Sequence, residues 1–283
     1  DNIKHLCKVL KDKDPVLFSQ TILKLYAFMR DTGFWDEAVE LYKSAIDLNI
    51  NSKNQNSLDI ISILRTQLSS FYLRLGSNKD LENARENLNL ALESFISKND
   101  KAGETRVLGR LGRIALREKK YEEALELSLK ALKIAEKIGL DDIIPDLEHE
   151  IGDEYFMLNK YDEAERMYLS SLNKYKAQEN EIRIIGRYND LGKLYLHRKE
   201  FKKAEKFLMK SIEMANEHQK MDTLCRAKIS LGELYLLIIR YPESKKYLTE
   251  GLDLANRLNA NSEAMKAEAL IKQLDEQYQE TNV

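Results

Sequence analysis

The sequence contains few residues that interrupt helices. Only three prolines and eleven glycines occur among its 283 residues. An all-β fold needs a turn every eight to twelve residues or so, and such turns draw on glycine and proline. Their scarcity therefore argues against an all-β fold. Helix-favouring leucine, alanine, glutamate and lysine are abundant instead, and we expect an all-α protein.

Other features are also missing. The two cysteines, Cys7 and Cys225, are too few for a disulfide framework, and no Asn-x-Ser/Thr sequon occurs. The longest apolar run, LYLLII at 234–239, is too short to span a bilayer, and no signal peptide is evident. The net charge is −2, from 45 basic and 47 acidic residues, so no overall basic field would hold nucleic acid. We expect a cytoplasmic protein without nucleic-acid or membrane partners.

Instead, the sequence repeats with a period of 40 residues. A glycine recurs in four copies, each preceded by leucine or isoleucine: Gly112, Gly152, Gly192 and Gly232. An aromatic column keeps the same step, at Tyr121, Tyr161, Phe201 and Tyr241, and a small-residue column follows it, at Ala124, Ala164, Ala204 and Ser244. The pattern continues backwards to Trp35 and Ala38. We expect six helix-turn-helix copies, over 15–48, 58–98, 102–139, 142–178, 181–218 and 221–258.

The last segment, 261–278, is predicted to be a single capping helix with Asn261 or Ser262 as its N-cap, and 1–283 to form one array. Proline and glycine fit the expected helix ends. Pro15 follows Asp14 as a first helical residue, and Gly139 falls just after a helix. The recurring glycines and alanines would let paired helices approach closely, while the large residues would fill the space between pairs. The aromatic column and Trp35 are therefore interpreted as core residues and not as a base-stacking platform.

These columns resemble the tetratricopeptide repeat. Leu191, Gly192, Tyr195, Phe201 and Ala204 match its pattern of large, small and aromatic positions, as do Leu208 and Ser211. The resemblance covers about residues 15 to 258, but the period is 40 and not 34, and the proline that often closes the second helix is absent. It implies a right-handed superhelical solenoid in which the first helix of each pair lines a concave, partner-binding face. Similar arrays occur in large bacterial regulators, kinesin light chains and cell-polarity adaptors.

No catalytic motif is found in the sequence. The segment GRYNDLGKL at 186–194 only loosely resembles a phosphate loop, because the glycine spacing is wrong and Leu194 replaces the required serine or threonine. His149 and Asp153 are four residues apart, but a metal site needs three or four ligands. Cys225 falls in an apolar helical pattern and is predicted to be a buried small residue. We expect a protein without enzymatic activity, metal or cofactor.

Four arginines share one helical face of the third copy: Arg106, Arg110, Arg113 and Arg117. Forty residues further on, the same phase holds Asp146, Glu150, Asp153 and Met157. Ion pairs such as Arg110–Glu150 and Arg113–Asp153 are therefore predicted between neighbouring helices. Two hypotheses stay open: the arginines are neutralised laterally, or a part of the stripe, with Arg117 and Arg106 as its unmatched edge, binds an acidic peptide.

A second candidate surface lies in the fifth copy, at Asn189, Lys193 and His197. An asparagine on a groove-lining helix can donate to and accept from a peptide backbone. The alternative is that these three residues form an ordinary solvated polar face.

From these patterns we expect a scaffold or sensor that binds a protein or peptide in its groove. Three other functions stay open. The chain begins at Asp1 and not at methionine, which suggests the ligand-sensing arm of a larger regulator, such as a nucleotide-driven switch or a transcription regulator. The other two are a receptor for small signalling peptides and an assembly subunit held by its outer face. The sequence identifies neither the partner nor the oligomeric state.

Overall fold

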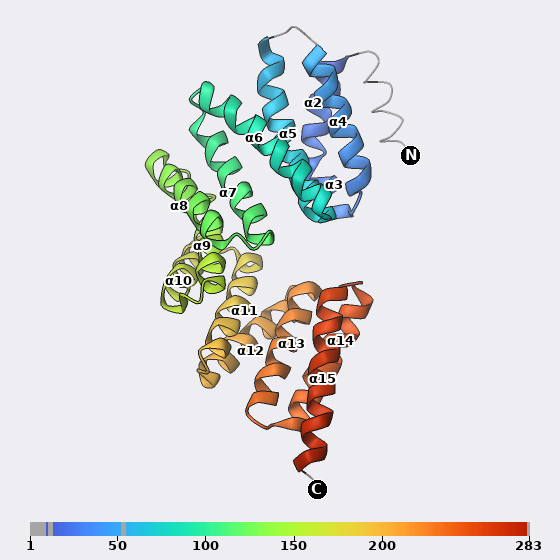
Figure 1. The fold of residues 1–283 in the computed structure, drawn as a ribbon, viewed down its shortest axis with the longest axis vertical. Coiled ribbons are helices and arrows are strands. Elements are labelled where there is room, and N and C mark those ends of the chain that lie inside the picture. The colour runs from blue at the N-terminus through green and yellow to red at the C-terminus, as the bar shows by residue number, and fades with distance from the viewer. Residues whose placement is uncertain (1–9, 11–13, 52–54, 282–283) are drawn as a thin grey trace. The chain divides into compact units, whose positions relative to one another are not determined.

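The computed structural model describes residues 10, 14–51 and 55–281, and all regular secondary structure in these ranges is helical (Figure 1). The fold class expected from composition is confirmed. Contacts divide the chain into two compact units, residues 1–150 and 151–283. Whether the whole chain acts as one array, as predicted, stays a prediction. Within the described residues, no helix combines the length and apolarity needed to cross a membrane.

The helices alternate with short turns along each unit. The first unit contains α2 (Pro15–Lys24), α3 (Tyr26–Thr32), α4 (Trp35–Asn51), α5 (Gln55–Leu75), α6 (Asn78–Ser97), α7 (Lys101–Arg117) and α8 (Tyr121–Ile138). It also contains the beginning of α9 (Ile144–Met157). The rest of α9 belongs to the second unit, with α10 (Tyr161–Ala177), α11 (Glu181–His197), α12 (Phe201–Glu217), α13 (Met221–Leu237), α14 (Tyr241–Arg257) and α15 (Asn261–Thr281).

Local chemistry explains where several helices begin and end. The side chain of Asp14 accepts a hydrogen bond from the backbone N–H of Leu17, which satisfies one free donor at the start of α2, where Pro15 is the first residue. Gly139 ends α8 in the left-handed conformation, as expected. One boundary differs from prediction. Helix α15 already includes Asn261, so Asn261 and Ser262 are helical residues and not the N-cap. The first predicted helix is also interrupted, at Leu25 between α2 and α3.

A left-handed residue recurs in the turns every 20 residues, although most of these residues are not glycine. The φ angles lie between 53° and 63° at eight positions: Asn99, Lys119, Asn159, Glu179, Lys199, Gln219, Ile239 and Asn259. The next N–H reaches back to close the helix, as in the 2.8 Å bond from Asp100 N to Phe95 O. A 17-residue helix followed by such a three-residue turn produces half of the 40-residue period.

Ile239 is the most unfavourable of these turn residues, because a β-branched side chain is strained at positive φ and this one is 68% exposed. We expect Ile239→Gly to raise the free energy of unfolding by about 1 kcal/mol, measured by chemical denaturation. As a matched control, Ile63→Gly inside helix α5 should lower it. Destabilisation by Ile239→Gly would contradict this account.

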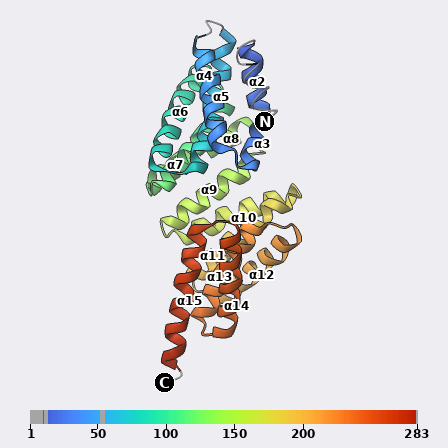
Figure 2. The ribbon, with the colours of Figure 1, turned by 90° about the vertical axis from the view of Figure 1, so that its right-hand side faces the viewer.

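Neighbouring helices pack as antiparallel pairs, and the first helices of successive pairs also touch, as α11 touches α13 and α13 touches α15. In Figures 1 and 2, α15 lies beside α13 and α14 at the end of the second unit. Its buried side chains, Ala267 and Leu274, face this cluster, while Glu268 and Lys272 are exposed. The helix thus covers the apolar edge of the last pair, which is what a cap requires.

Small and large residues are divided between the helices of a pair as the sequence pattern implies. A Cβ atom added at Gly192 on α11 would lie 2.6 Å from the side chain of Leu208 on α12. The equivalent distance from Gly232 to Leu248 is also 2.6 Å. The aromatic column is only half-buried, with Tyr161, Phe201 and Tyr241 packed against the core from its edge. Trp35 is half-buried as well, and its indole N–H donates to the carbonyl of Arg30 at 3.1 Å.

Polar clusters join neighbouring pairs and were not predicted. The hydroxyl of Tyr195 on α11 donates to Glu165 on α10, and Arg198 pairs with the same carboxylate at 2.6 Å. Forty residues on, the hydroxyl of Tyr235 donates to Glu205 at 2.6 Å. Burial, followed by the nearby carboxylate, raises the pKa of both Tyr195 and Tyr235. These aromatic residues therefore hold two repeats together through a hydrogen bond as well as through packing.

Candidate functional site

The arginine stripe lies on α7, which begins after Asp100. The Asp100 side chain accepts a 2.9 Å hydrogen bond from the N–H of Gly103 and so caps the helix. The steps of four, three and four residues place the arginines on one side of α7. The opposite side is buried, with Val107, Leu111 and Ile114 in the core. The helix therefore presents a charged face that the fold leaves uncovered in part.

Three of the four arginines line a cleft of ≈240 Å³. Its remaining walls come from α7 and from the turn and first residues of α9, and they combine apolar and acidic groups. The lining residues are Thr105, Arg106, Gly109, Arg110, Arg113, Ile143, Asp146, Leu147 and Glu150. The predicted juxtaposition of the two charged stripes is thus seen within the first unit.

The ion pairs differ from those predicted. Glu150 lies 3.6 Å from Nε of Arg113, whose side chain is 53% exposed. Arg110, the expected partner of Glu150, turns the other way and donates from Nε to the hydroxyl of Ser70 on α5 at 3.1 Å. It also attracts Tyr26, which contributes to lowering the pKa of that phenol. Burial lowers the pKa of Arg110, because its guanidinium lies between elements of the unit and is removed from water. The pair Arg113–Asp153 stays a prediction.

Arg117 is not the unengaged end of the stripe that the sequence suggested. Its guanidinium donates to the carbonyl of Leu73, near the end of α5. A cation there satisfies a free carbonyl and complements the negative end of the helix dipole. The sequence comparison considered only the side chains of the second copy and therefore missed a backbone acceptor.

Arg106 is the arginine that the fold leaves available. It is exposed, lines the cleft, and makes no hydrogen bond or ion pair with any residue that the structure describes. The predicted pair with Asp146 is not formed, although both residues line the same cleft. The cleft therefore presents one unengaged guanidinium, from Arg106, and one weakly engaged guanidinium, from Arg113, beside the apolar side chains of Ile143 and Leu147.

The second candidate surface, on α11, is not a single site. Asn189 is only 1% exposed, and its Oδ1 atom has no hydrogen-bond partner. His197 packs edge-on against Phe156, with ring centroids 4.8 Å apart, and partial burial lowers its pKa. Lys193 alone among the three lines a pocket, which belongs to the second unit. Across the described ranges, no group of three or more His, Cys, Asp or Glu residues is placed to hold a metal ion.

Comparisons with known proteins agree with this geometry. Models of the tetratricopeptide repeat match residues 104–177 and 185–218, which include the helices that carry both candidate surfaces. The chain is a tetratricopeptide repeat protein. No curated protein is significantly similar to it in sequence.

Solved structures share the fold of this tetratricopeptide repeat protein at low sequence identity. BtubC (BKLC) from P. vanneervenii is 18% identical, with a TM-score of 0.66 over 80% of this chain and 92% of that one. The apo form of RapI is 15% identical, with a TM-score of 0.65 over 90% and 99% of the two chains. A Rap protein complexed with Competence and Sporulation Factor is 15% identical, with a TM-score of 0.64 over 89% and 74%.

Proposed function

We propose that this tetratricopeptide repeat protein is a non-catalytic binding scaffold whose α7–α9 cleft holds an acidic segment of a partner protein. The observation that carries the proposal is Arg106, an exposed guanidinium without a partner at the rim of a cleft that also contains Arg113. A guanidinium binds a carboxylate through two parallel hydrogen bonds, so an acidic side chain of the partner could pair with Arg106.

The other walls of the cleft support a peptide ligand. Ile143 and Leu147 offer apolar surface to a neighbouring side chain of the partner. Asp146 and Glu150 leave the cleft with mixed charge, which would favour a segment carrying both an acidic and a basic or amide group over a purely acidic one. Because Arg110 and Arg117 are already bonded to Ser70 and Leu73, they position the helix and are not assigned as ligand contacts.

Charge reversal at Arg106 tests the proposal. A pull-down with the full chain would identify bound proteins, and calorimetry with acidic peptides derived from them would measure affinity. We expect Arg106→Glu to weaken binding at least tenfold, because one bidentate pair is lost and a like charge faces the ligand. Arg166→Glu, at a 72% exposed arginine on α10, is the matched control and should leave binding unchanged. Equal affinity of wild type and Arg106→Glu would overturn the proposal.

A second candidate function is a receptor for a short signalling peptide. It is favoured by the fold shared with a Rap protein that was solved with Competence and Sporulation Factor bound. The same calorimetry separates the two functions. Peptides of five to ten residues that bind as tightly as the intact partner favour the receptor, whereas binding that needs a folded partner favours the scaffold.

A further inference from the structure

A small pocket in the second unit collects positive charge from three separate helices. Lys193 comes from α11, Arg226 from α13 and Lys266 from α15. The pocket has a volume of ≈110 Å³, and its remaining lining residues are Ile229, Ser230, Ser262 and Glu263. Because α11 touches α13 and α13 touches α15, the packing of consecutive repeats brings the three cations together.

Two of the three cations have partners at their outer sides. Nζ of Lys266 lies 2.6 Å from Glu233, and a terminal nitrogen of Arg226 lies 3.3 Å from Asp222. Lys193 is half-buried and makes no hydrogen bond or ion pair with the residues that the structure describes. An ammonium that is partly removed from water normally has a counter-charge, so Lys193 is the group that a ligand would satisfy.

The electrostatic surroundings of Lys193 agree with a vacancy for negative charge. Burial lowers the pKa of Lys193, and Arg226 and Lys266 lower it further. Asp190 and Asp153 act in the opposite direction, but the net shift is downward. His197, one turn further along α11, also has its pKa lowered in part by Lys193 and Lys266. An anion between these cations would reverse the shift on Lys193.

Size and charge define the class of anion. Three cations and the single carboxylate of Glu263 leave the lining with two positive charges in excess, which matches a dianion. The pocket has no aromatic lining for a nucleobase, and its volume suits one compact group rather than a peptide segment. The Arg226 guanidinium can donate two parallel hydrogen bonds to a tetrahedral oxyanion, and Ser262 brings the first turn of α15, whose free N–H groups favour negative charge.

We propose that Lys193, Arg226 and Lys266 form a binding site for a phosphoryl dianion. The site is separate from the α7–α9 cleft and does not depend on the function proposed for that cleft. Lys193 supplies the buried counter-charge, Arg226 fixes the orientation of the oxygens, and Lys266 closes the pocket from the capping helix. The phosphoryl group comes either from free phosphate or from a phosphorylated side chain, and the experiment separates these sources.

Thermal unfolding of the full chain tests this site, with sodium phosphate and O-phospho-L-serine as probes and sodium acetate as the monoanion control, all at constant ionic strength. We expect both phosphoryl compounds to raise the melting temperature saturably, and acetate to bind at least tenfold more weakly. Binding of O-phospho-L-serine as tight as that of phosphate, or tighter, indicates a phosphorylated side chain. Much weaker binding indicates the free ion.

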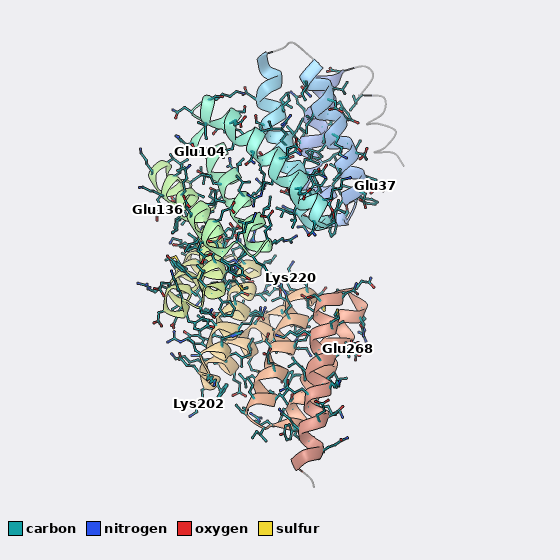
Figure 3. All side chains as sticks on the ribbon, viewed as in Figure 1. Glu37, Glu104, Glu136, Lys202, Lys220 and Glu268 are labelled. Carbon is teal, nitrogen blue, oxygen red and sulfur yellow. The ribbon has the colours of Figure 1, made fainter. Side chains whose placement is uncertain are left out.

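Lys193→Met keeps the length of the side chain and removes its charge, so the variant should fold at least as stably as wild type while losing the saturable response. Lys202→Met is the matched control, because Lys202 projects outward from α12 into solvent (Figure 3). It should retain the full response, as should Arg106→Glu in the other cleft. Carbon-13 NMR of the lysine Cε atoms adds an independent measurement, in which phosphate should raise the pKa of Lys193.

Two results would overturn the site. One is a saturable phosphate response of equal size in wild type and Lys193→Met, which would mean that the anion binds elsewhere. The other is the absence of any saturable response in wild type to either phosphoryl compound. Because Arg106→Glu is measured in parallel, failure of this site and failure of the α7–α9 cleft give different outcomes.

Discussion

Gly192→Ala should lower the free energy of unfolding of the second unit by about 1–3 kcal/mol, because the added methyl group has no room. Its Cβ would lie 2.6 Å from the side chain of Leu208 and 3.2 Å from the backbone nitrogen of the same residue. Leu208 is fully buried, so it cannot turn away into solvent, and α11 and α12 would have to separate. Chemical denaturation followed by circular dichroism measures the change.

Gly186 on the same helix provides the matched control. An added Cβ meets no atom within 4 Å there, and the residue has an ordinary helical backbone. Gly186→Ala should therefore stabilise the protein by about 0.5–1 kcal/mol through helix propensity alone. If both substitutions changed stability in the same direction, the close approach at Gly192 would not be what limits packing between the paired helices.

Tyr195→Phe should cost about 1.5 kcal/mol of stability, since it removes a hydrogen bond between a partly buried hydroxyl and the charged carboxylate of Glu165. The ring, which stacks on Phe207 with centroids 5.3 Å apart, would remain in place. The loss falls on the contact between α10 and α11, which belong to successive repeats. Urea denaturation of the variant and of wild type measures it.

Tyr188→Phe is the control for this second substitution. The Tyr188 ring also packs against Phe207, at 5.9 Å, but its hydroxyl donates no hydrogen bond to any residue that the structure describes. Its removal should change stability by less than about 0.5 kcal/mol. A loss at Tyr188 equal to that at Tyr195 would show that the ring and not the hydroxyl joins the repeats.

The period of 40 residues was sufficient to predict the helices. Gly192, Phe201 and Ala204 recur because each repeat needs a small residue where its two helices meet and a large one beside it, and this requirement is visible in sequence. The residue at which a helix starts was less accessible. Asn261 and Ser262 are both good N-caps by type, and the structure begins α15 at Asn261.

Side-chain pairing in the cleft could not be predicted to the same degree. Counting by 40 placed Arg110 opposite Glu150 and left Arg117 without a partner, because the count compares only equivalent side chains. In the structure Arg110 reaches Ser70 on the preceding repeat and Arg117 reaches a backbone carbonyl. A long arginine side chain can turn toward either neighbouring helix, and every residue offers a carbonyl, so sequence spacing does not fix its acceptor.

The regular succession of 17-residue helices and three-residue turns has a consequence for folding. Each helix packs mainly on the next helices in the chain, so the contacts that form the core join residues close in sequence. Closing such short loops costs little entropy, and a nucleus of two or three helices can form at many points along the chain. We expect rapid folding that spreads from such nuclei to their neighbours, with the terminal repeats, which have one neighbour instead of two, opening first.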